Sequence, residues 1–204
     1  LLGGLHMLAK SPLVVVAGMW SPPNNFSPIN TDSSYGYYCV RFMFQGLLEA
    51  RLENNQMRFF PALASRWQVG ADRQTFTFAI HPRAAWHDGR PVTADDVLFT
   101  VMTISDPKTQ TNRGAYIAHI AGLTAGGKRT AEPLGFKILT PKSFEVKTKA
   151  PVDPNSFLEF FGANIYILPK HILGNVPPEN LARHPFFMAP TVANGPFKFV
   201  QYKT

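Results

Sequence analysis

Polar and apolar residues alternate along residues 75–80, and this alternation is the clearest local pattern in the chain. A period of two places Phe76, Phe78 and Ile80 on one face, which predicts a β-strand buried on that face alone. A second alternating stretch, 67–69, precedes it across the turn-forming residues 70–73. The two stretches therefore predict an antiparallel hairpin.

A helix is predicted to begin shortly after this strand, with Thr93 as its N-cap. Asp95 and Asp96 place negative charge in the first turn, where the helix dipole is positive. Pro107 ends the segment, because proline does not continue a helix. Four apolar residues share one face of the predicted helix: Val97, Leu98, Val101 and Met102.

The rest of the chain adds strands and short helices, which together predict an α/β fold with mixed α+β sheets. The expected elements are a buried strand at 13–17, a helix around the apolar cluster 40–48, a hairpin turn at 54–55, a strand–turn–strand unit at 136–148, a short helix capped by Asp153, an extended stretch at 165–168, a short helix at 169–173 with proline at its first position, a proline-rich connector at 175–192 and a final strand after 194–196.

Composition and charge narrow the class of protein. The chain has 204 residues, of which 45% are hydrophobic, so it can bury a substantial core. Its 20 basic and 13 acidic residues give a net charge of +7. The basic residues are scattered, with Lys128-Arg129 as the only adjacent pair, which favours a solvated surface and leaves a nucleic-acid-binding module as an alternative. No apolar run approaches the roughly 18 residues of a transmembrane helix.

Three candidate chemistries are weakened by their context. Residues 122–128 have the glycine–lysine spacing of a phosphate-binding loop, but Arg129 stands where a serine or threonine must hold magnesium. The six histidines form no i,i+4 pair, so no metal site and no cofactor is predicted. Cys39 is the single cysteine, and its apolar setting favours a small core residue. A Cys-dependent hydrolase stays open as an alternative, and its activity would be abolished by Cys39→Ala.

Four motifs in a fixed order resemble one known family. They are Pro61-Ala62-Leu63-Ala64 with Trp67, the strand 75–80, the turn Trp86-His87-Asp88-Gly89-Arg90-Pro91, and Thr93-Ala94-Asp95-Asp96-Val97. The order resembles the extracytoplasmic solute-binding proteins of ABC importers, in the oligopeptide/dipeptide/nickel group known as family 5. The resemblance extends from about Leu13 to Thr204, whereas family members are much longer.

The resemblance implies a fold and a division into domains. It implies the N-terminal lobe of a periplasmic-binding-protein-like class II fold, with its second lobe missing. The core of this lobe is expected at 8–45 and 170–204, with an inserted α/β subdomain at 46–169, and residues 1–7 are expected to be a trimmed leader or a remnant of cloning.

The resemblance also implies a function without catalysis. The protein would capture short peptides, or a related small solute, and deliver them to the permease subunits of an ABC importer. It would work outside the cytoplasm, in the periplasm or on the outer face of the cell membrane. It would have no nucleic-acid partner and would meet the membrane only through the permease or a lipid anchor. Because half of the cleft would be absent, the isolated chain is expected to bind its solute weakly.

Aromatic residues supply the candidate ligand site. A tyrosine ring offers an apolar face and a hydroxyl, which suits a cleft that holds varied ligands. Counted from Phe44-Gln45-Gly46 and from Asp106-Pro107, two stretches of this chain fall where relatives contact their ligand. The candidate ligand-binding residues are Tyr35, Gly36, Tyr37, Tyr38, Cys39 and Tyr116, with Trp20, just past the first predicted strand, as a further candidate.

Overall fold

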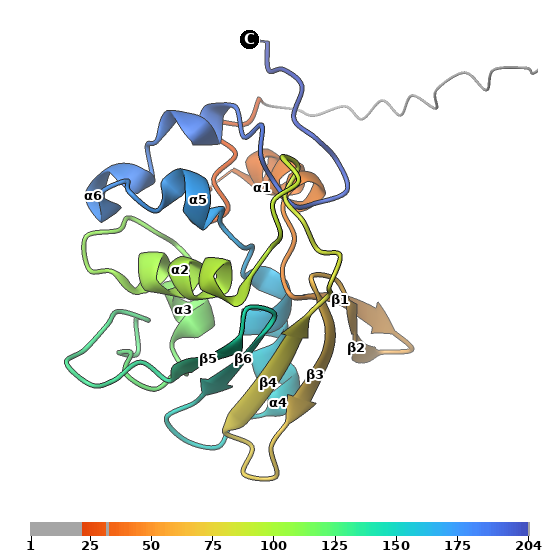
Figure 1. The fold of residues 1–204 in the computed structure, drawn as a ribbon, viewed down its shortest axis with the longest axis vertical. Helices are drawn as coiled ribbons and strands as arrows, with labels where there is room; N and C mark the ends of the chain where they lie inside the picture. Colours follow the sequence, from red (N-terminus) through yellow and green to blue (C-terminus); the bar gives the residue numbers. More distant parts are fainter. Residues whose placement is uncertain (1–21, 32, 204) are drawn as a thin grey trace, which may run out of the picture.

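The computed structural model describes residues 22–31 and 33–203, so the predicted strand at 13–17 and the candidate Trp20 lie outside the described residues. The described chain is a mixed α/β structure, as predicted (Figure 1). Its elements in order are α1 (Ser34–Met43), β1 (Leu48–Glu53), β2 (Gln56–Pro61), β3 (Ala64–Val69), β4 (Thr75–Ile80), α2 (Ala94–Ser105), α3 (Gly114–Ile117), β5 (Phe136–Thr140), β6 (Ser143–Lys147), α4 (Pro154–Phe157), the π-helix η1 (Leu158–Ala163), α5 (Lys170–Leu173), α6 (Pro178–Leu181) and the 3-10 helix η2 (Pro185–Met188).

Two antiparallel sheets organise these elements. The larger sheet has the order β3-β4-β6-β5, and it contains the hairpin predicted across 70–73 and the strand–turn–strand unit predicted at 136–148. The two hairpins join through β4 and β6, where Phe78 lies opposite Phe144. The smaller sheet is the β1–β2 hairpin, which projects beside the larger one in Figure 1. Asn54 and Asn55 form its turn with φ of 49° and 63°, a left-handed conformation that asparagine tolerates well.

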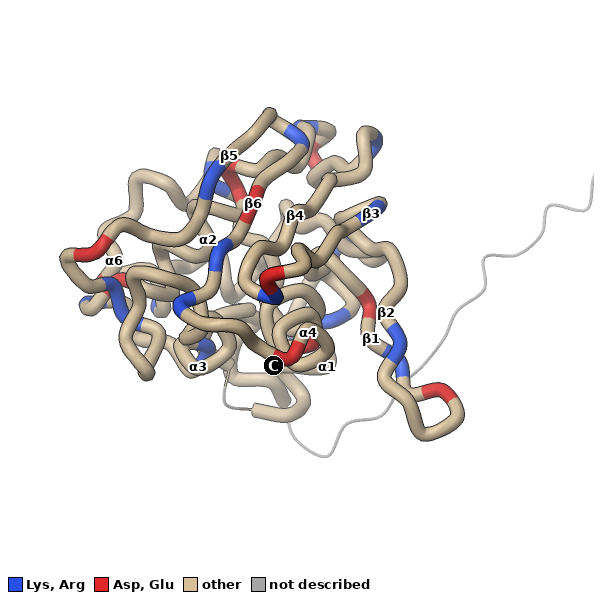
Figure 2. The backbone as a smooth tube through the Cα atoms, turned by 90° about the horizontal axis from the view of Figure 1, so that it is seen from below, with Lys and Arg blue, Asp and Glu red and all other residues tan. Residues whose placement is uncertain are grey.

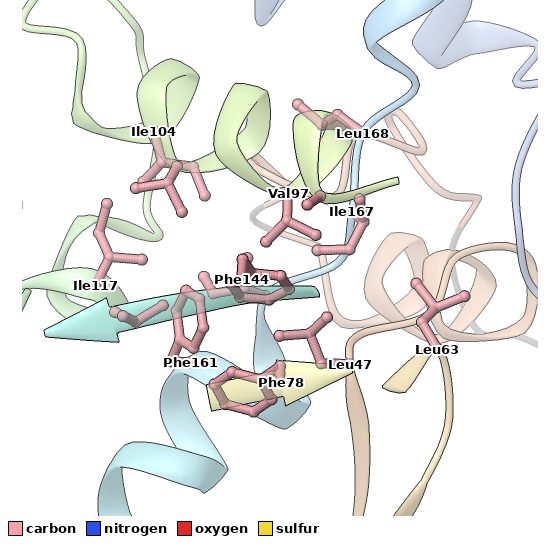
Figure 3. Packing of buried hydrophobic residues seen from close by; sticks show 14 of the residues in the cluster. Leu47, Leu63, Phe78, Val97, Ile104, Ile117, Phe144, Phe161, Ile167 and Leu168 are labelled. Atoms are coloured by element: carbon pink, nitrogen blue, oxygen red, sulfur yellow. The ribbon is translucent and has the colours of Figure 1, made fainter. Parts of the chain in front are cut away.

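Aromatic side chains on one face of the larger sheet form the core. The rings of Phe78 and Phe144 stack with their centroids 5.4 Å apart, and Phe161 of η1 packs against Phe78 at 5.8 Å. Figure 3 shows this cluster beneath α2, from which Val97 and Ile104 point toward the sheet. The alternation in β4 therefore does what its period predicts: every second residue is buried against the helices.

The start of α2 is held by a buried carboxylate. Asp96, only 5% exposed, accepts hydrogen bonds at Oδ2 from the Thr93 N–H at 2.9 Å and the Thr93 hydroxyl at 3.1 Å. Trp86 Nε1 donates to the same oxygen at 3.4 Å, and the Lys170 N–H donates to Oδ1 at 3.1 Å. The N-cap prediction is confirmed, and one carboxylate ties α2 to the turn before it and to the start of α5. Asp95 is exposed and pairs with the Lys170 ammonium at 2.9 Å.

The apolar stripe of α2 differs in part from the prediction. Val97 and Val101 are buried, but Leu98 and Met102 are only half-buried. Ile104, which the predicted stripe leaves out, is buried, and so are Ala94 and Thr100. The buried surface of the helix is therefore shifted relative to the sequence stripe and broader than it.

A lysine ammonium closes the other end of α2. Lys128 Nζ donates to the carbonyl oxygens of Ile104 at 3.2 Å, Asp106 at 2.8 Å and Thr109 at 3.0 Å. These carbonyls belong to the last turn of the helix and the loop after it, where acceptors lack partners within the helix. The lysine of the glycine–lysine stretch 122–128 therefore has a structural role.

Helix α1 is shifted relative to the helix predicted around 40–48. Its N-cap is Ser33, whose hydroxyl accepts from the Gly36 N–H, and it ends at Met43. Beyond it the chain is extended at Phe44, and Gly46 passes close to the carbonyls of Gly162, Ala163 and Ile165, where a side chain would clash. Leu48 then begins β1.

Two smaller expectations near the C-terminus are also wrong, and a third is incomplete. Pro169 is the N-cap of α5 rather than its first residue. The connector at 175–192 contains two helical turns, α6 and η2. No strand forms in the described residues after 194–196; there the Phe197 N–H bonds to the Phe42 carbonyl beside α1, so this segment lies against a helix and not in a sheet.

A second, smaller core joins the two ends of the described chain. It consists of buried residues from the N-terminal and C-terminal segments together with Tyr166: Phe26, Val40, Met43, Phe44, Tyr166 and Ala193. The main core also contains residues from the same terminal segments, namely Ile29, Leu173, Leu181 and Phe187, so the two cores do not separate the predicted domains. The domain boundaries themselves stay a prediction.

Candidate functional site

One open hollow brings together tyrosines that are far apart in the sequence. It has a volume of about 420 Å³ and lies between α1 and the start of α3. Its lining residues are Thr31, Ser33, Ser34, Tyr37, Tyr38, Arg41, Arg113 and Tyr116. Three of the predicted ligand residues, Tyr37, Tyr38 and Tyr116, are therefore neighbours in space.

Hydrogen bonds with Asn164 and Tyr166 hold Tyr37 in place. Its hydroxyl donates to Asn164 Oδ1 at 3.2 Å and accepts from the Tyr166 hydroxyl at 3.3 Å. Burial, together with the hydrogen bond to Tyr37, raises the pKa of Tyr166, so this phenol stays a donor at any physiological pH. Asn164 directly follows the π-helix η1, a type of helix that often marks functional sites. The Tyr37 ring is thus fixed before any ligand arrives.

Tyr116 is positioned by the same π-helix. Its ring meets Phe160 edge-on, with centroids 5.5 Å apart. Tyr38 is different, because its side chain is 54% exposed and presents a free ring face at the rim of the hollow. The hollow therefore combines fixed aromatic rings with one accessible ring.

Two arginines complete the lining, and sequence reasoning missed both. The Cζ atom of Arg113 lies 5.2 Å from the Tyr37 ring centroid and 5.3 Å from that of Tyr116. Arg41 lies 6.0 Å from the Tyr37 ring centroid on the opposite part of the lining. The one sequence signal for either was the i,i+4 spacing of Tyr37 and Arg41, which places them on the same helix face.

Three other predicted site residues, Tyr35, Gly36 and Cys39, lie outside this hollow, whereas Trp20 is not among the described residues. Tyr35 is half-buried and does not line it. Gly36 is buried, and a side chain there would collide with Thr31 Oγ1 and the Asn25 carbonyl, so its role is close packing. Cys39 packs beside the second core, and burial raises the pKa of its thiol, which makes it a poor nucleophile at neutral pH.

A second hollow of about 410 Å³ adjoins the first, and Arg41 lines both. It lies between the end of α1, the β1–β2 hairpin and η1. Polar groups of Gln45, Glu49, Glu159 and Asn164 line it. The two hollows form one polar and aromatic surface along α1.

The part of the chain that the structure describes forms neither a metal-binding site nor a phosphate-binding site. No group of three His, Cys, Asp or Glu side chains is close enough there to hold a metal ion. His87 instead links the turn at 86–89 to the C-terminal segment: Nε2 is 2.8 Å from the Gly195 carbonyl and Nδ1 accepts from the Ala193 N–H. Lys128 is already occupied by three carbonyls.

Comparison with known proteins identifies the family. Residues 58–204 match the middle region of the family described as bacterial extracellular solute-binding proteins, family 5. The chain belongs to this family. The match includes α3 and η1, two of the elements that build the hollow, while α1 precedes the matched residues.

Individual solute-binding relatives agree with the family assignment. The chain is 30% identical over 208 residues to the dipeptide-binding protein DppE of Bacillus subtilis, covering 98% of this chain and 36% of DppE. It is 34% identical over 116 residues to the periplasmic oligopeptide-binding protein OppA of Salmonella typhimurium, covering 55% of this chain and 21% of OppA.

The fold agrees as well. The structure of NikZ from Campylobacter jejuni, solved in complex with Ni(L-His), superposes with a TM-score of 0.69 at 26% identity, over 90% of this chain and 32% of NikZ. The chain thus spans roughly a third or less of the length of these solute-binding proteins. Within the described residues, no helix is long and apolar enough to cross a membrane.

Proposed function

We propose that this chain forms part of the substrate-binding component of an ABC importer, and that it contributes one wall of the solute site. The solute is a short peptide or a related small molecule, which the protein delivers to the permease subunits outside the cytoplasm. The protein contacts the membrane through the permease or a lipid anchor. The family consists of solute-binding proteins, and no reaction is assigned to the site.

One observation carries this proposal: tyrosines from α1 and α3, about eighty residues apart, line a single open hollow. Three aromatic rings with hydroxyls suit a ligand of variable shape, because rings contact apolar groups and hydroxyls bind backbone amides. The fixed position of Tyr37 reduces the entropy lost when a ligand binds. The scattered charge in Figure 2, with Lys and Arg interspersed among Asp and Glu, gives no comparable support to nucleic-acid binding.

Tyr38→Ala tests the proposal directly. The Tyr38 side chain is largely exposed, so its removal is expected to change stability little. Isothermal titration with a set of di- and tripeptides is expected to show affinity lower by about 3- to 10-fold, the usual contribution of one aromatic contact. Tyr35→Ala, on the same helix but outside the hollow, is the matched control and is expected to bind like the wild type.

Two results would count against the proposal. Because the isolated chain is expected to bind weakly, the titrations use each peptide up to its solubility limit; if no peptide of the set binds the wild-type chain there, the assignment to peptide capture fails. If Tyr35→Ala and Tyr38→Ala lose affinity equally while both remain folded by circular dichroism, the solute does not use this hollow.

A further inference from the structure

Arg113 is a buried cation. Only 8% of the residue is exposed, yet it lines the hollow. Its Nε donates to the Pro28 carbonyl at 3.3 Å, which anchors one edge of the guanidinium. Burying a charge is costly unless a partner of opposite charge compensates for it.

Some more exposed arginines of the described chain have an acidic partner, whereas others, such as Arg66 and Arg83, form no ion pair with a described residue. Arg51, Arg58, Arg90 and Arg129 each form an ion pair with a carboxylate. Arg113 is more buried than any of them, but it forms no ion pair with an Asp or Glu that the structure describes. Its positive charge therefore needs another explanation.

The aromatic rings around Arg113 compensate for its charge only in part. Tyr37 and Tyr116 both lie within cation–π distance of its guanidinium. Such contacts leave the N–H groups of the guanidinium free to donate, and a planar fork of donors matches a carboxylate.

The charge of the whole lining has the same sign. Arg41 adds a second cation, which also lines the adjoining hollow with Glu49 and Glu159, and none of the described residues that line this hollow is acidic. A hollow with two guanidinium groups, aromatic walls and hydroxyls is complementary to an anion attached to an organic body.

We propose that Arg113 binds a carboxylate group of the solute, with Arg41 adding long-range attraction. This inference rests on the proposed function and narrows it: the preferred solute carries a carboxylate that enters the hollow between Tyr37 and Tyr116. The ion pair missing from the described protein is formed by the ligand.

Titration calorimetry with three probes tests the carboxylate. They are Ala-Ala-Ala, its C-terminal amide, and Ala-Asp-Ala C-terminal amide. Trialanine is expected to bind about 10- to 100-fold more tightly than its amide, the range for a hydrogen-bonded charge. If the aspartyl amide recovers the affinity, the site accepts a side-chain carboxylate; if it does not, the site reads the peptide terminus. Equal binding of trialanine and its amide would overturn the inference and leave the proposed function standing.

Substitutions assign the effect to Arg113. Arg113→Gln is expected to bind trialanine and its amide alike, whereas Arg113→Lys, which keeps the charge but loses the fork, is expected to retain part of the preference. Arg83→Gln removes an exposed arginine and is expected to keep the full preference. If Arg113→Gln does not fold, the test rests on Arg113→Lys. An undiminished preference of that variant for trialanine over its amide would contradict a two-pronged contact between Arg113 and the carboxylate.

A probe without a peptide separates this inference from the proposed function. Acetate, titrated against chloride at equal ionic strength, is expected to shift the Nε–Hε NMR signal of Arg113 and not that of Arg83. If no peptide binds but this shift occurs, the peptide assignment fails and the carboxylate site stands. If neither occurs, both fail.

Discussion

Replacing Asp96 by alanine is expected to loosen the whole region where the turn at 86–89, α2 and α5 meet. The carboxylate accepts four hydrogen bonds, from Trp86 Nε1, from the N–H and hydroxyl of Thr93, and from the Lys170 N–H. It is 5% exposed, so water does not easily replace it.

The magnitude follows from the donors that are left without an acceptor. A hydrogen bond to a charged group contributes about 1.5–3 kcal/mol, and bonds that share one carboxylate are not additive. The Thr93 hydroxyl can turn toward solvent, and the Trp86 bond is long at 3.4 Å. We therefore expect Asp96→Ala to lower the free energy of unfolding by about 4 kcal/mol, in the range for breaking a buried polar network. For a chain of this length, Tm should fall by about 8–16 °C.

Urea denaturation followed by tryptophan fluorescence measures this loss. The midpoint should fall while the m-value stays constant, because the surface exposed on unfolding does not change. Asp95→Asn is the matched control: its ion pair with Lys170 is half-exposed on both sides and should contribute less than about 1 kcal/mol. A loss below about 1 kcal/mol for Asp96→Ala, or equal losses in the two variants, would refute the idea that Asp96 joins these elements.

Three further predictions concern single positions. Lys128→Met should lower the free energy of unfolding by about 1–3 kcal/mol, because three carbonyls lose their donor, and a loss below ~0.5 kcal/mol in urea denaturation would contradict this role. Gly127→Ala should lower the free energy of unfolding by about 3 kcal/mol or more, since Gly127 has φ of +72° and a methyl group there would overlap the Gly114 carbonyl. Gly126→Ala, where the added methyl group has room, should lower it little. Equal melting temperatures of the two variants would contradict the argument. Backbone and side-chain hydrogen bonds at the start of α4 hold the pKa of Asp153 below its ordinary value of 3.8, so its stabilising effect should be present above pH 4 and lost as the pH falls through the lowered pKa. The difference in Tm between the wild type and Asp153→Asn should therefore shrink on acidification from pH 6 to pH 3, and a constant difference would argue against this cap.

Local patterns predicted much of the secondary structure. The alternation in β4, the turn at Asn54 and Asn55, and the N-cap of α2 are all confirmed. Each depends on residues close in sequence, and the period of two identifies the buried face without reference to any partner. The pairing of β4 with β6 was not predicted, because periodicity does not specify which distant strand supplies the neighbour.

The candidate site was predictable only through family resemblance, and then only in part. Tyr37, Tyr38 and Tyr116 do meet at one hollow, although their role as ligand residues stays a prediction. Tyr35 was chosen by the same argument, but it lies two residues before Tyr37, which turns its side chain by about 200° around the helix, and it does not line the hollow. Arg113 gave no signal, because its side chain is held by residues far away in the sequence, the Pro28 carbonyl and the Tyr37 ring.

The lysine at the end of α2 has a practical consequence for following the protein in solution. Burial lowers the pKa of Lys128, so its amine would be more nucleophilic than surface lysines if reagents reached it. Three carbonyls enclose it instead, and acylation must wait until this helix end opens. The labelling rate of this amine, read by peptide mass mapping, therefore reports local opening at the end of α2.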